Sequence, residues 1–220
     1  MKRPSIAVIL SGCGNLDGSE IHEATLTLWA IHKHGADFQC YAPDIPQHHV
    51  INHLTGEVTN DERNVLTESA RIARGKVINL ADFRAEKHDA LILPGGLGAA
   101  KNLSDYAFAG PECTVNPDVA RALQEMSALK KPIGALCIAP MALVRVLPGV
   151  NITIGQDKDT AAIAERMGAH HTPASHGEIV VDRRHRVVTT PCYMLDARVD
   201  QIGQGADNLV GAILEMLSSD

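Results

Sequence analysis

KPIGALCIAP, residues 131–140, is a short apolar run that ends on a thiol, Cys137, and is followed at once by small residues and a proline. This pattern predicts a buried strand that turns sharply into a helix. A nucleophile on such an elbow projects clear of the sheet, and the neighbouring backbone N–H groups can stabilise an oxyanion. The competing interpretation is a buried core cysteine, which is the commoner fate of a cysteine among apolar neighbours.

The composition favours a single α/β domain spanning residues 1–220. Apolar residues make up 45% of the chain but aromatic residues only 3%, so the core must consist mainly of Val, Ile, Leu and Ala, as in parallel sheets. The net charge of −6 argues against a nucleic-acid partner. No segment approaches the roughly 20 apolar residues of a membrane span, so we expect no membrane partner.

The cysteines indicate a reducing compartment. There are five of them, an odd number without a C-x-x-C pair: Cys13, Cys40, Cys113, Cys137 and Cys192. This pattern predicts neither a disulfide framework nor a structural zinc site. We therefore expect a cytoplasmic protein with free thiols.

Strand-like and helix-like segments alternate along the chain. Strands are expected at residues 6–10, 38–41, 76–80 and 90–93 and at the elbow, helices at 19–34, 62–74, 117–129 and 205–217, and a hairpin at 178–181 and 187–190. Ser19 and Asn116 are the expected N-caps. This order predicts a mostly parallel sheet with helices on both faces. Its ligand site should lie beyond the carboxyl ends of the strands, where loops 11–19 and 94–98 meet the elbow.

Three features could then form one catalytic constellation. Glu20 opens the first predicted helix, where an acid is also simply favoured by the helix dipole. Gly95 and Gly96 could form a tight turn, or could present a bare backbone N–H to a developing negative charge. With Cys137 they would supply an acid, an oxyanion hole and a nucleophile. Cys13 in the first loop and Tyr193 near the end of the chain are further candidates for lining the site.

Long strings of the sequence carry a family resemblance. They are ILSGCG at 9–14, DGSEIHEA at 17–24, INHLTGE at 51–57, GAAKNL at 98–103, VTTP at 188–191 and YML at 193–195. With the two glycines before residue 97 and the Gly-x-x-Cys elbow, these strings resemble the ElbB-type glyoxalases, in the PfpI branch of the class I glutamine amidotransferase-like superfamily. The resemblance covers nearly the whole chain.

This resemblance implies a flavodoxin-like three-layer sandwich and a homodimer. It also implies a glyoxalase activity that converts glyoxal to glycolate without metal, glutathione or nucleotide, and a link to isoprenoid biosynthesis. The family's nucleophile and acid correspond to Cys137 and Glu20, and its oxyanion donors to the backbone of Gly96 and Ile138. An ionised acid beside the nucleophile would disfavour the thiolate. We therefore expect Glu20 to be protonated and to donate a hydrogen bond to the sulfur.

The sequence gives weaker support to four other functions: a protease, an amidotransferase, a dinucleotide-binding protein and a redox sensor. Ile138 stands where peptidase-like members carry His, which lowers the odds of a Cys-His protease. His176 and Glu178 imitate the His-x-Glu of amidotransferases, but they precede a strand-like run instead of ending one. Gly12-x-Gly14 resembles a dinucleotide fingerprint whose third glycine is displaced by one residue. A non-enzymatic redox sensor or regulatory protein with Cys137 as its oxidisable thiol is the alternative of a different class.

Overall fold

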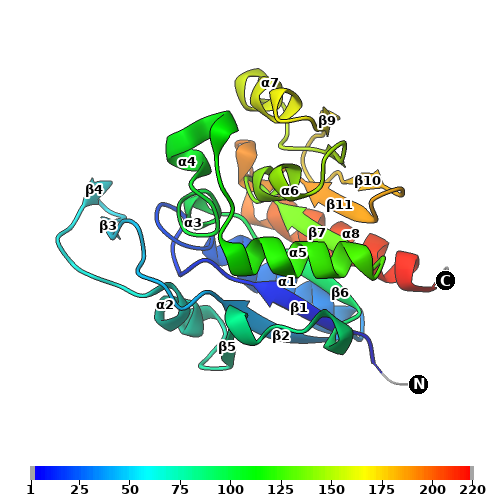
Figure 1. Cartoon of the computed structure of the whole chain (residues 1–220), viewed down its shortest axis with the longest axis horizontal. Coiled ribbons are helices and arrows are strands. Elements are labelled where there is room, and N and C mark those ends of the chain that lie inside the picture. The colour runs from blue at the N-terminus through cyan, green and yellow to red at the C-terminus, as the bar shows by residue number, and fades with distance from the viewer. Residues whose placement is uncertain (1–2, 219–220) are drawn as a thin grey trace.

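Short runs of fully buried apolar residues form the centre of the sheet. Every side chain of the strands that end at Leu93 and Leu136 is buried. The computed structural model describes residues 3–218, and Figure 1 shows its three layers. In spatial order the strands are β10 (Val180–Asp182), β11 (Val187–Thr190), β7 (Ile133–Leu136), β6 (Ala90–Leu93), β1 (Ser5–Ile9), β2 (Asp37–Ala42) and β5 (Val77–Asn79). Only the β10–β11 pair is antiparallel within this sheet.

Helices cover both faces of the sheet. One face carries α1 (Ile21–Lys33), which packs against α8 (Val199–Ser218) and α2 (Val65–Ile72). The other face carries α5 (Pro117–Ala128), α6 (Pro140–Val146) and α3 (Leu97–Lys101), with α4 (Tyr106–Ala109) and α7 (Lys158–Arg166) beyond them. The predicted flavodoxin-like sandwich, mostly parallel with helices on both faces, is confirmed.

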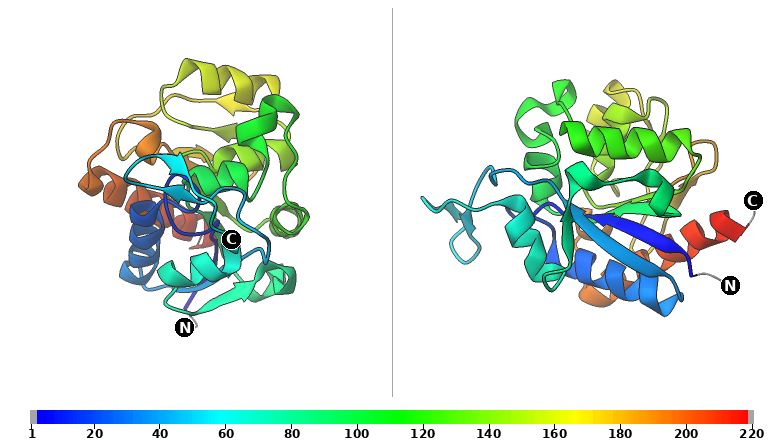
Figure 2. Two further views of the ribbon diagram at one scale, coloured as in Figure 1. Left: turned by 90° about the vertical axis from the view of Figure 1, so that its left-hand side faces the viewer. Right: turned by 60° about the horizontal axis from the view of Figure 1, so that its bottom comes forward.

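The remaining elements are short. Two small pairs lie outside the main sheet: β3 (Ile51–Asn52) with β4 (Glu57–Val58), and β8 (Asn151–Ile152) with β9 (His170–His171). The 3-10 turns are Leu80–Asp82, Ala85–Lys87, Gly110–Glu112 and Cys192–Met194. The β3–β4 hairpin falls in a region where the sequence had no clear periodicity, and it projects from the carboxyl edge of the sheet (Figure 2).

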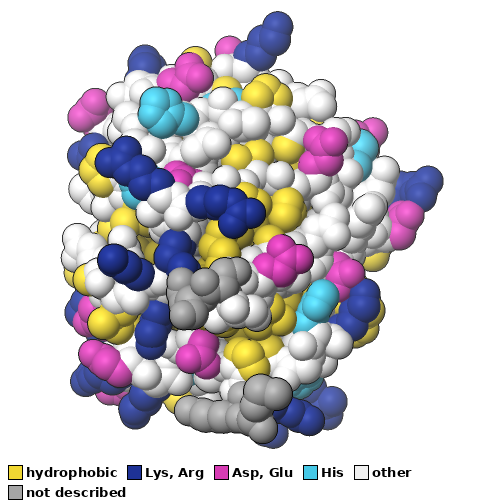
Figure 3. Space-filling view, turned by 90° about the vertical axis from the view of Figure 1, so that its right-hand side faces the viewer, with side chains coloured by type: hydrophobic (Ala, Val, Ile, Leu, Met, Phe, Trp, Pro, Cys, Tyr) yellow, Lys and Arg dark blue, Asp and Glu magenta, His cyan; other side chains and the backbone are white. Residues whose placement is uncertain are grey.

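The order of strands locates the site. After β1, the chain adds β2 and β5 on one side of β1 and then β6 and β7 on its other side. The connections therefore run in opposite directions from the gap between β1 and β6. Crevices at such switch points are where ligands bind in open α/β sheets. Figure 3 shows the opposite edge, at the amino ends of the parallel strands, where acidic and basic side chains are interspersed around apolar ones.

Two expected N-caps had different outcomes. Asn116 caps α5 by accepting hydrogen bonds from the backbone of Asp118 and Val119, as predicted. The cap of α1 is Glu20, whose carboxylate accepts from the backbone N–H of Glu23. Ser19 instead turns its hydroxyl toward the loop after β1 and accepts a hydrogen bond from the N–H of Ser11 at 2.8 Å. The prediction of Ser19 as the cap was therefore wrong, because its hydroxyl is used to close that loop.

Candidate active site

Cys137 occupies the predicted elbow between β7 and α6. Its φ of 58° lies in the left-handed region, which a non-glycine residue adopts only when its surroundings hold it there. The backbone N–H of Cys137 donates to the carbonyl of Thr190 at 3.0 Å, which fixes the turn to the neighbouring strand. The side chain is 7% exposed, so the thiol is enclosed yet reachable from a cavity.

Two backbone N–H groups point at the sulfur. Those of Gly96 and Ile138 hydrogen-bond Cys137, the same two groups that were expected to serve as oxyanion donors. Gly96 has φ 94°, and a Cβ there would lie 2.3 Å from the backbone nitrogen of Glu20. A Cβ on Gly95 would lie 2.5 Å from the Cβ of Cys137. Both positions therefore require glycine, so that the loop after β6 can approach the nucleophile and the start of α1.

The acid beside the thiol is Glu23. Its carboxyl group is completely buried and hydrogen-bonds Cys137. One carboxyl oxygen accepts from the N–H of Gly95 at 2.9 Å, and the other accepts from the N–H of Tyr193 at 3.3 Å. Burial, followed by the nearby charge of Glu20, raises the pKa of Glu23 to about 8. At neutral pH Glu23 is therefore a neutral acid that can donate a proton toward the sulfur.

The structure thus assigns to Glu23 the contact that the sequence predicted for Glu20. The Glu20 carboxylate accepts the N–H of Glu23 at 2.7 Å and lines the cavity, with 12% of its side chain exposed. The physical reason is position on the helix. Glu20 precedes the first turn, so its side chain folds back onto the helix end, whereas Glu23 lies on the stripe that faces the sheet. The sequence does hold a signal for Glu23: its carboxylate lies at helical spacing with Thr27 and Ile31, on the buried side of the helix. An ionisable group in such a position is a candidate for a functional site.

Burial also raises the pKa of the Cys137 thiol well above its ordinary value, and the charge of Glu23 adds to the shift. The N–H groups of Gly96 and Ile138 oppose it by favouring the thiolate. Because the two buried acids share a hydrogen bond, they titrate as a pair. The resting site at neutral pH therefore holds a thiol and a carboxylic acid.

A cavity of about 620 Å³ opens over the thiol. Its lining residues are Asn15, Glu20, His22, Gly96, Leu97, Cys137, Ile138, Tyr193 and Met194. The structure therefore places Tyr193 at the site, as expected from the sequence. Gly95 lies behind the thiol, where its N–H holds Glu23. The cavity is large enough for a small carbonyl compound and for the water that would hydrolyse a product.

Cys13 does not lie among the described residues that line this cavity. Its charged neighbours are Arg71 and Glu68, at α2, and burial raises the pKa of its thiol. The prediction of Cys13 as a site neighbour was therefore wrong. The loop after β1 places Cys13 toward α2, while Asn15 and Glu20 of the same loop line the cavity.

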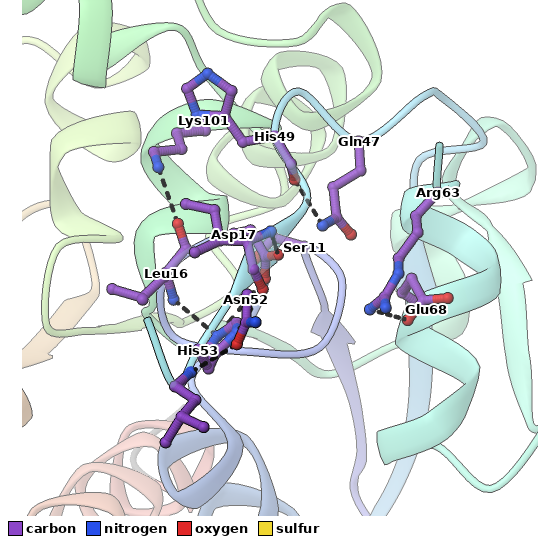
Figure 4. A network of polar contacts seen from close by, with 12 residues as sticks. Ser11, Leu16, Asp17, Gln47, His49, Asn52, His53, Arg63, Glu68 and Lys101 are labelled. Carbon is purple, nitrogen blue, oxygen red and sulfur yellow. Dashed lines mark hydrogen bonds and ion pairs between the residues drawn. The ribbon is translucent and has the colours of Figure 1, made fainter. Parts of the chain in front are cut away.

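That loop is fixed from several sides, as Figure 4 shows. The side-chain amide of Asn102 donates to the carbonyls of Ser11 and Asp17 at 3.0 and 2.9 Å. Asp17 accepts from the backbone N–H of Ile51 at 2.7 Å, and Lys101 donates to the carbonyl of Leu16 at 2.9 Å. These contacts hold the start of α1, and with it Glu20 and Glu23, in a single position relative to the loop after β6.

The structure around this loop and the cavity argues against two alternative functions, dinucleotide binding and amidotransferase chemistry. A Cβ added at Gly14 would meet the ring of His53 at 2.6 Å and the carboxylate of Asp17 at 2.9 Å, so the glycine loop is packed by side chains and faces an acid. A phosphate-binding loop needs open backbone N–H groups and no such negative charge. His176 and Glu178 are not among the described residues that line the cavity over Cys137, and no amidotransferase-like triad is assembled there.

The residues at the site that sequence reasoning missed include Cys192 and His22. Cys192 is 5% exposed, and burial, together with the charges of Glu23 and Cys137, raises the pKa of its thiol. His22 hydrogen-bonds the phenol of Tyr193 through Nδ1 at 2.8 Å. Neither carries a local signal, because each becomes part of the site only when the segment around residue 193 packs against the start of α1.

No cluster of three or more His, Cys, Asp or Glu side chains within residues 3–218 could hold a metal ion. Over the same residues, no helix has both the length and the apolar character needed to cross a bilayer. All five cysteines are free thiols.

No protein-family model matches the chain, but individual known proteins are clearly related to it. It is 46% identical to the rat "ES1 protein homolog, mitochondrial", over 97% of this chain and 84% of the relative. It is also 46% identical to the human "Glutamine amidotransferase-like class 1 domain-containing protein 3, mitochondrial", over 96% of this chain and 82% of the relative.

Solved structures agree with these relatives. An isoprenoid biosynthesis protein with an amidotransferase-like domain from Ehrlichia chaffeensis superimposes with a TM-score of 0.89 at 35% identity, covering 96% of this chain and 99% of that chain. Glyoxalase III from Candida albicans shares the fold, with a TM-score of 0.62 at 15% identity and 97% of each chain covered. The chain therefore belongs to the ES1 family of glutamine amidotransferase-like proteins.

Proposed function

We propose that this protein is a cofactor-independent glyoxalase that converts glyoxal, or a similarly small dicarbonyl, to the hydroxy acid. The observation that carries the proposal is the arrangement around one thiol. Cys137 lies at the floor of an open cavity, beside the neutral acid Glu23 and two backbone N–H groups. A nucleophile, a proton carrier and oxyanion donors are the parts that addition to an aldehyde requires.

The reaction uses these parts in sequence. The sulfur of Cys137 adds to one aldehyde carbon, and the thiol proton passes, through Glu23, to the carbonyl oxygen, which gives a hemithioacetal. A proton is then removed from that carbon and delivered to the neighbouring carbonyl carbon through an enediol. This leaves a thioester of the hydroxy acid. Water hydrolyses the thioester and returns the thiol, so glyoxal plus water gives glycolate with no net oxidation.

Activation of the thiol supplies little of the rate. Even a thiol whose pKa is lowered from ~8.5 to ~6 gains only a few-fold, because the larger thiolate fraction is offset by weaker nucleophilicity. Cys137 does not reach even that state, since burial and Glu23 raise its pKa. Positioning and the two backbone N–H groups, which meet the charge as it forms, must therefore contribute most of the acceleration.

The raised pKa also bears on the redox-sensor alternative. Cysteines that react readily with oxidants have a lowered pKa and an exposed thiolate. Cys137 has neither property. Turnover separates the two functions, since a sensor reacts with oxidant but releases no product from glyoxal.

The wider biological setting is part of the proposal. The Ehrlichia protein, 35% identical, is described as an isoprenoid biosynthesis protein, which supports a link to that pathway. The resemblance to ElbB-type proteins supports a homodimer with a small dicarbonyl as its substrate. A cytoplasmic location remains a prediction; the rat and human relatives carry "mitochondrial" in their names.

The test is production of glycolate from glyoxal by the purified protein, without added metal or glutathione. The wild type should form glycolate, and Cys137→Ser should form none. Cys13→Ser is the matched control, because Cys13 is more exposed than Cys137 yet lies outside the cavity; it should retain full activity. Glycolate from the Cys137→Ser variant, or none from the wild type, would overturn the proposal.

A further inference from the structure

The proposed reaction needs a base that Glu23 cannot readily supply. Both oxygens of Glu23 accept backbone N–H groups, from Gly95 and Tyr193, while the side chain also contacts Cys137. Glu23 is thus enclosed on the sulfur side of the site. A substrate bonded to the sulfur has to occupy the cavity, because the cavity is the open space at Cys137. A second group, on the open side, has to take the proton that moves between the two substrate carbons.

The described residues that line the cavity carry four ionisable side chains: Glu20, His22, Cys137 and Tyr193. Cys137 is the nucleophile, and one oxygen of Glu20 is occupied by the N–H of Glu23. Burial and the charges of Glu20 and Glu23 raise the pKa of the Tyr193 phenol, which therefore keeps its proton. Imidazole is the side chain that ordinarily exchanges a proton near neutral pH.

The contacts of His22 favour the tautomer that a base requires. Its Nδ1 atom lies 2.8 Å from the phenol oxygen of Tyr193 and 3.9 Å from a carboxylate oxygen of Glu20. The carboxylate is too far away to accept a hydrogen bond, but its charge favours the tautomer with the proton on Nδ1, with the phenol oxygen of Tyr193 as the acceptor. That leaves the lone pair on Nε2. The ring is half exposed, with 51% of the side chain accessible, so Nε2 is free of the packing that encloses Glu23.

We propose that His22 is the base that moves the proton between the two carbons of the substrate, with Tyr193 and Glu20 as the residues that orient its ring. The inference rests on the proposed glyoxalase function and deepens it. In the hemithioacetal, Nε2 takes the proton from the carbon bonded to sulfur, and the electron pair of that C–H bond forms the C=C bond of an enediolate. The hydroxyl proton on the sulfur-bearing carbon shifts to the oxygen of the neighbouring carbon. The imidazolium then returns its proton to that neighbouring carbon, which gives the thioester and restores neutral His22.

The experiment compares His22→Gln with wild type and with His32→Gln. His32 is the control because it is an exposed histidine in the last turn of the same helix. Loss of a general base costs about 10²–10⁴-fold, so His22→Gln should lower kcat by at least about 100-fold while His32→Gln leaves it unchanged. Tyr193→Phe, which removes one hydrogen bond, should lower kcat by about 5–10-fold.

Two further readouts separate a catalytic role from a structural one. The rate of Cys137 alkylation by iodoacetamide should be the same in His22→Gln and wild type, because the nucleophile is intact. Intact-mass analysis after mixing with glyoxal should show a Cys137 adduct accumulating in His22→Gln, since addition proceeds but the next step is blocked. If His22→Gln keeps wild-type turnover, or if alkylation falls together with turnover, the role of His22 is refuted. If the wild type makes no glycolate, the proposed function itself fails, which is a separate outcome.

Discussion

Glu23 and Cys137 share a hydrogen bond inside the protein, and this pairing affects their two pKa values in opposite directions. Burial and the charge of Glu23 raise the pKa of the Cys137 thiol, whereas the hydrogen bond with Cys137 lowers the pKa of Glu23 against the larger effect of burial. They lie on different elements, one in the first turn of α1 and the other on the elbow after β7. With a pKa of about 8, Glu23 is neutral when the thiol reacts near pH 7, and it becomes a repelling charge only at higher pH. The relation between these two groups leads to the first two predictions.

Glu23→Gln should separate thiol reactivity from turnover. The amide cannot pass on a proton, so glyoxal turnover should fall by about 10²–10⁴-fold. The amide also stays neutral at high pH, so alkylation of Cys137 at pH 9–10 should be faster than in wild type. Glu20→Gln, which changes the neighbouring carboxylate, is the matched control and should show the smaller loss of turnover. A larger loss in Glu20→Gln than in Glu23→Gln would return the acid role to Glu20.

The raised pKa of Glu23 also predicts how stability changes with pH. The pKa of an ordinary glutamate is 4.5 and that of Glu23 in the folded protein is about 8, so between these values the folded state binds the extra proton. The stability associated with the protonated group is fully present below pH ~4.5 and is lost as pH rises toward 8. Urea unfolding should therefore show wild type losing roughly 2–5 kcal/mol between pH 5 and pH 9 relative to Glu23→Gln. Parallel pH profiles for the two proteins would contradict this.

Gly95→Ala should damage the site. The new Cβ would lie 2.5 Å from the Cβ of Cys137 and 2.6 Å from a Glu23 oxygen, so the loop after β6 or the elbow has to shift. We expect a loss of about 1–3 kcal/mol of stability, as for overpacking in a core, and turnover at least about 10-fold lower. Gly203→Ala on α8 is the control, because its nearest heavy atoms lie 3.8–3.9 Å away and alanine favours a helix. Thermal unfolding and glycolate assays on both variants test the prediction; equal effects would refute it.

Asn102→Ala should act on the site through the loop after β1. The Asn102 side chain donates to Ser11 and Asp17 and accepts from the N–H of His48, and the residue is only 6% exposed. Its removal leaves buried backbone groups without partners, at a cost of about 2–4 kcal/mol. Ser104→Ala, also buried but bonded to the carbonyl of Ala99, is the comparison and should cost about 1 kcal/mol. Denaturant unfolding of both variants gives the difference, and an Asn102→Ala cost no greater than that of Ser104→Ala would show that the loop does not depend on this side chain.

Much of the fold follows from local features of the sequence. The buried apolar runs predicted β1, β6 and β7, and the hairpin around Asp182 was placed correctly because two strand-like runs flank a charged turn. The elbow at Cys137 was predicted because an apolar run that ends on a thiol, followed by small residues and a proline, is typical of a buried strand that turns sharply into a helix, and the left-handed backbone of Cys137 forms this turn. These features depend on neighbours in the chain, which is why they can be read before the structure is known.

The sequence by itself determined the three-layer fold, the elbow that carries Cys137 and the two glycines that let the loop after β6 approach it. Only the tertiary structure decided that Glu23 and not Glu20 meets the thiol, that Cys13 lies elsewhere, and that His22 pairs with Tyr193 across 171 residues of chain. The physical reason is that a carboxylate near the start of a helix can either cap the helix, as Glu20 does, or face the sheet and the thiol, as Glu23 does. Which residue takes which position depends on the rotation of α1 against the loops after β6 and β11. That rotation is set by packing between elements far apart in the chain, so no local pattern records it.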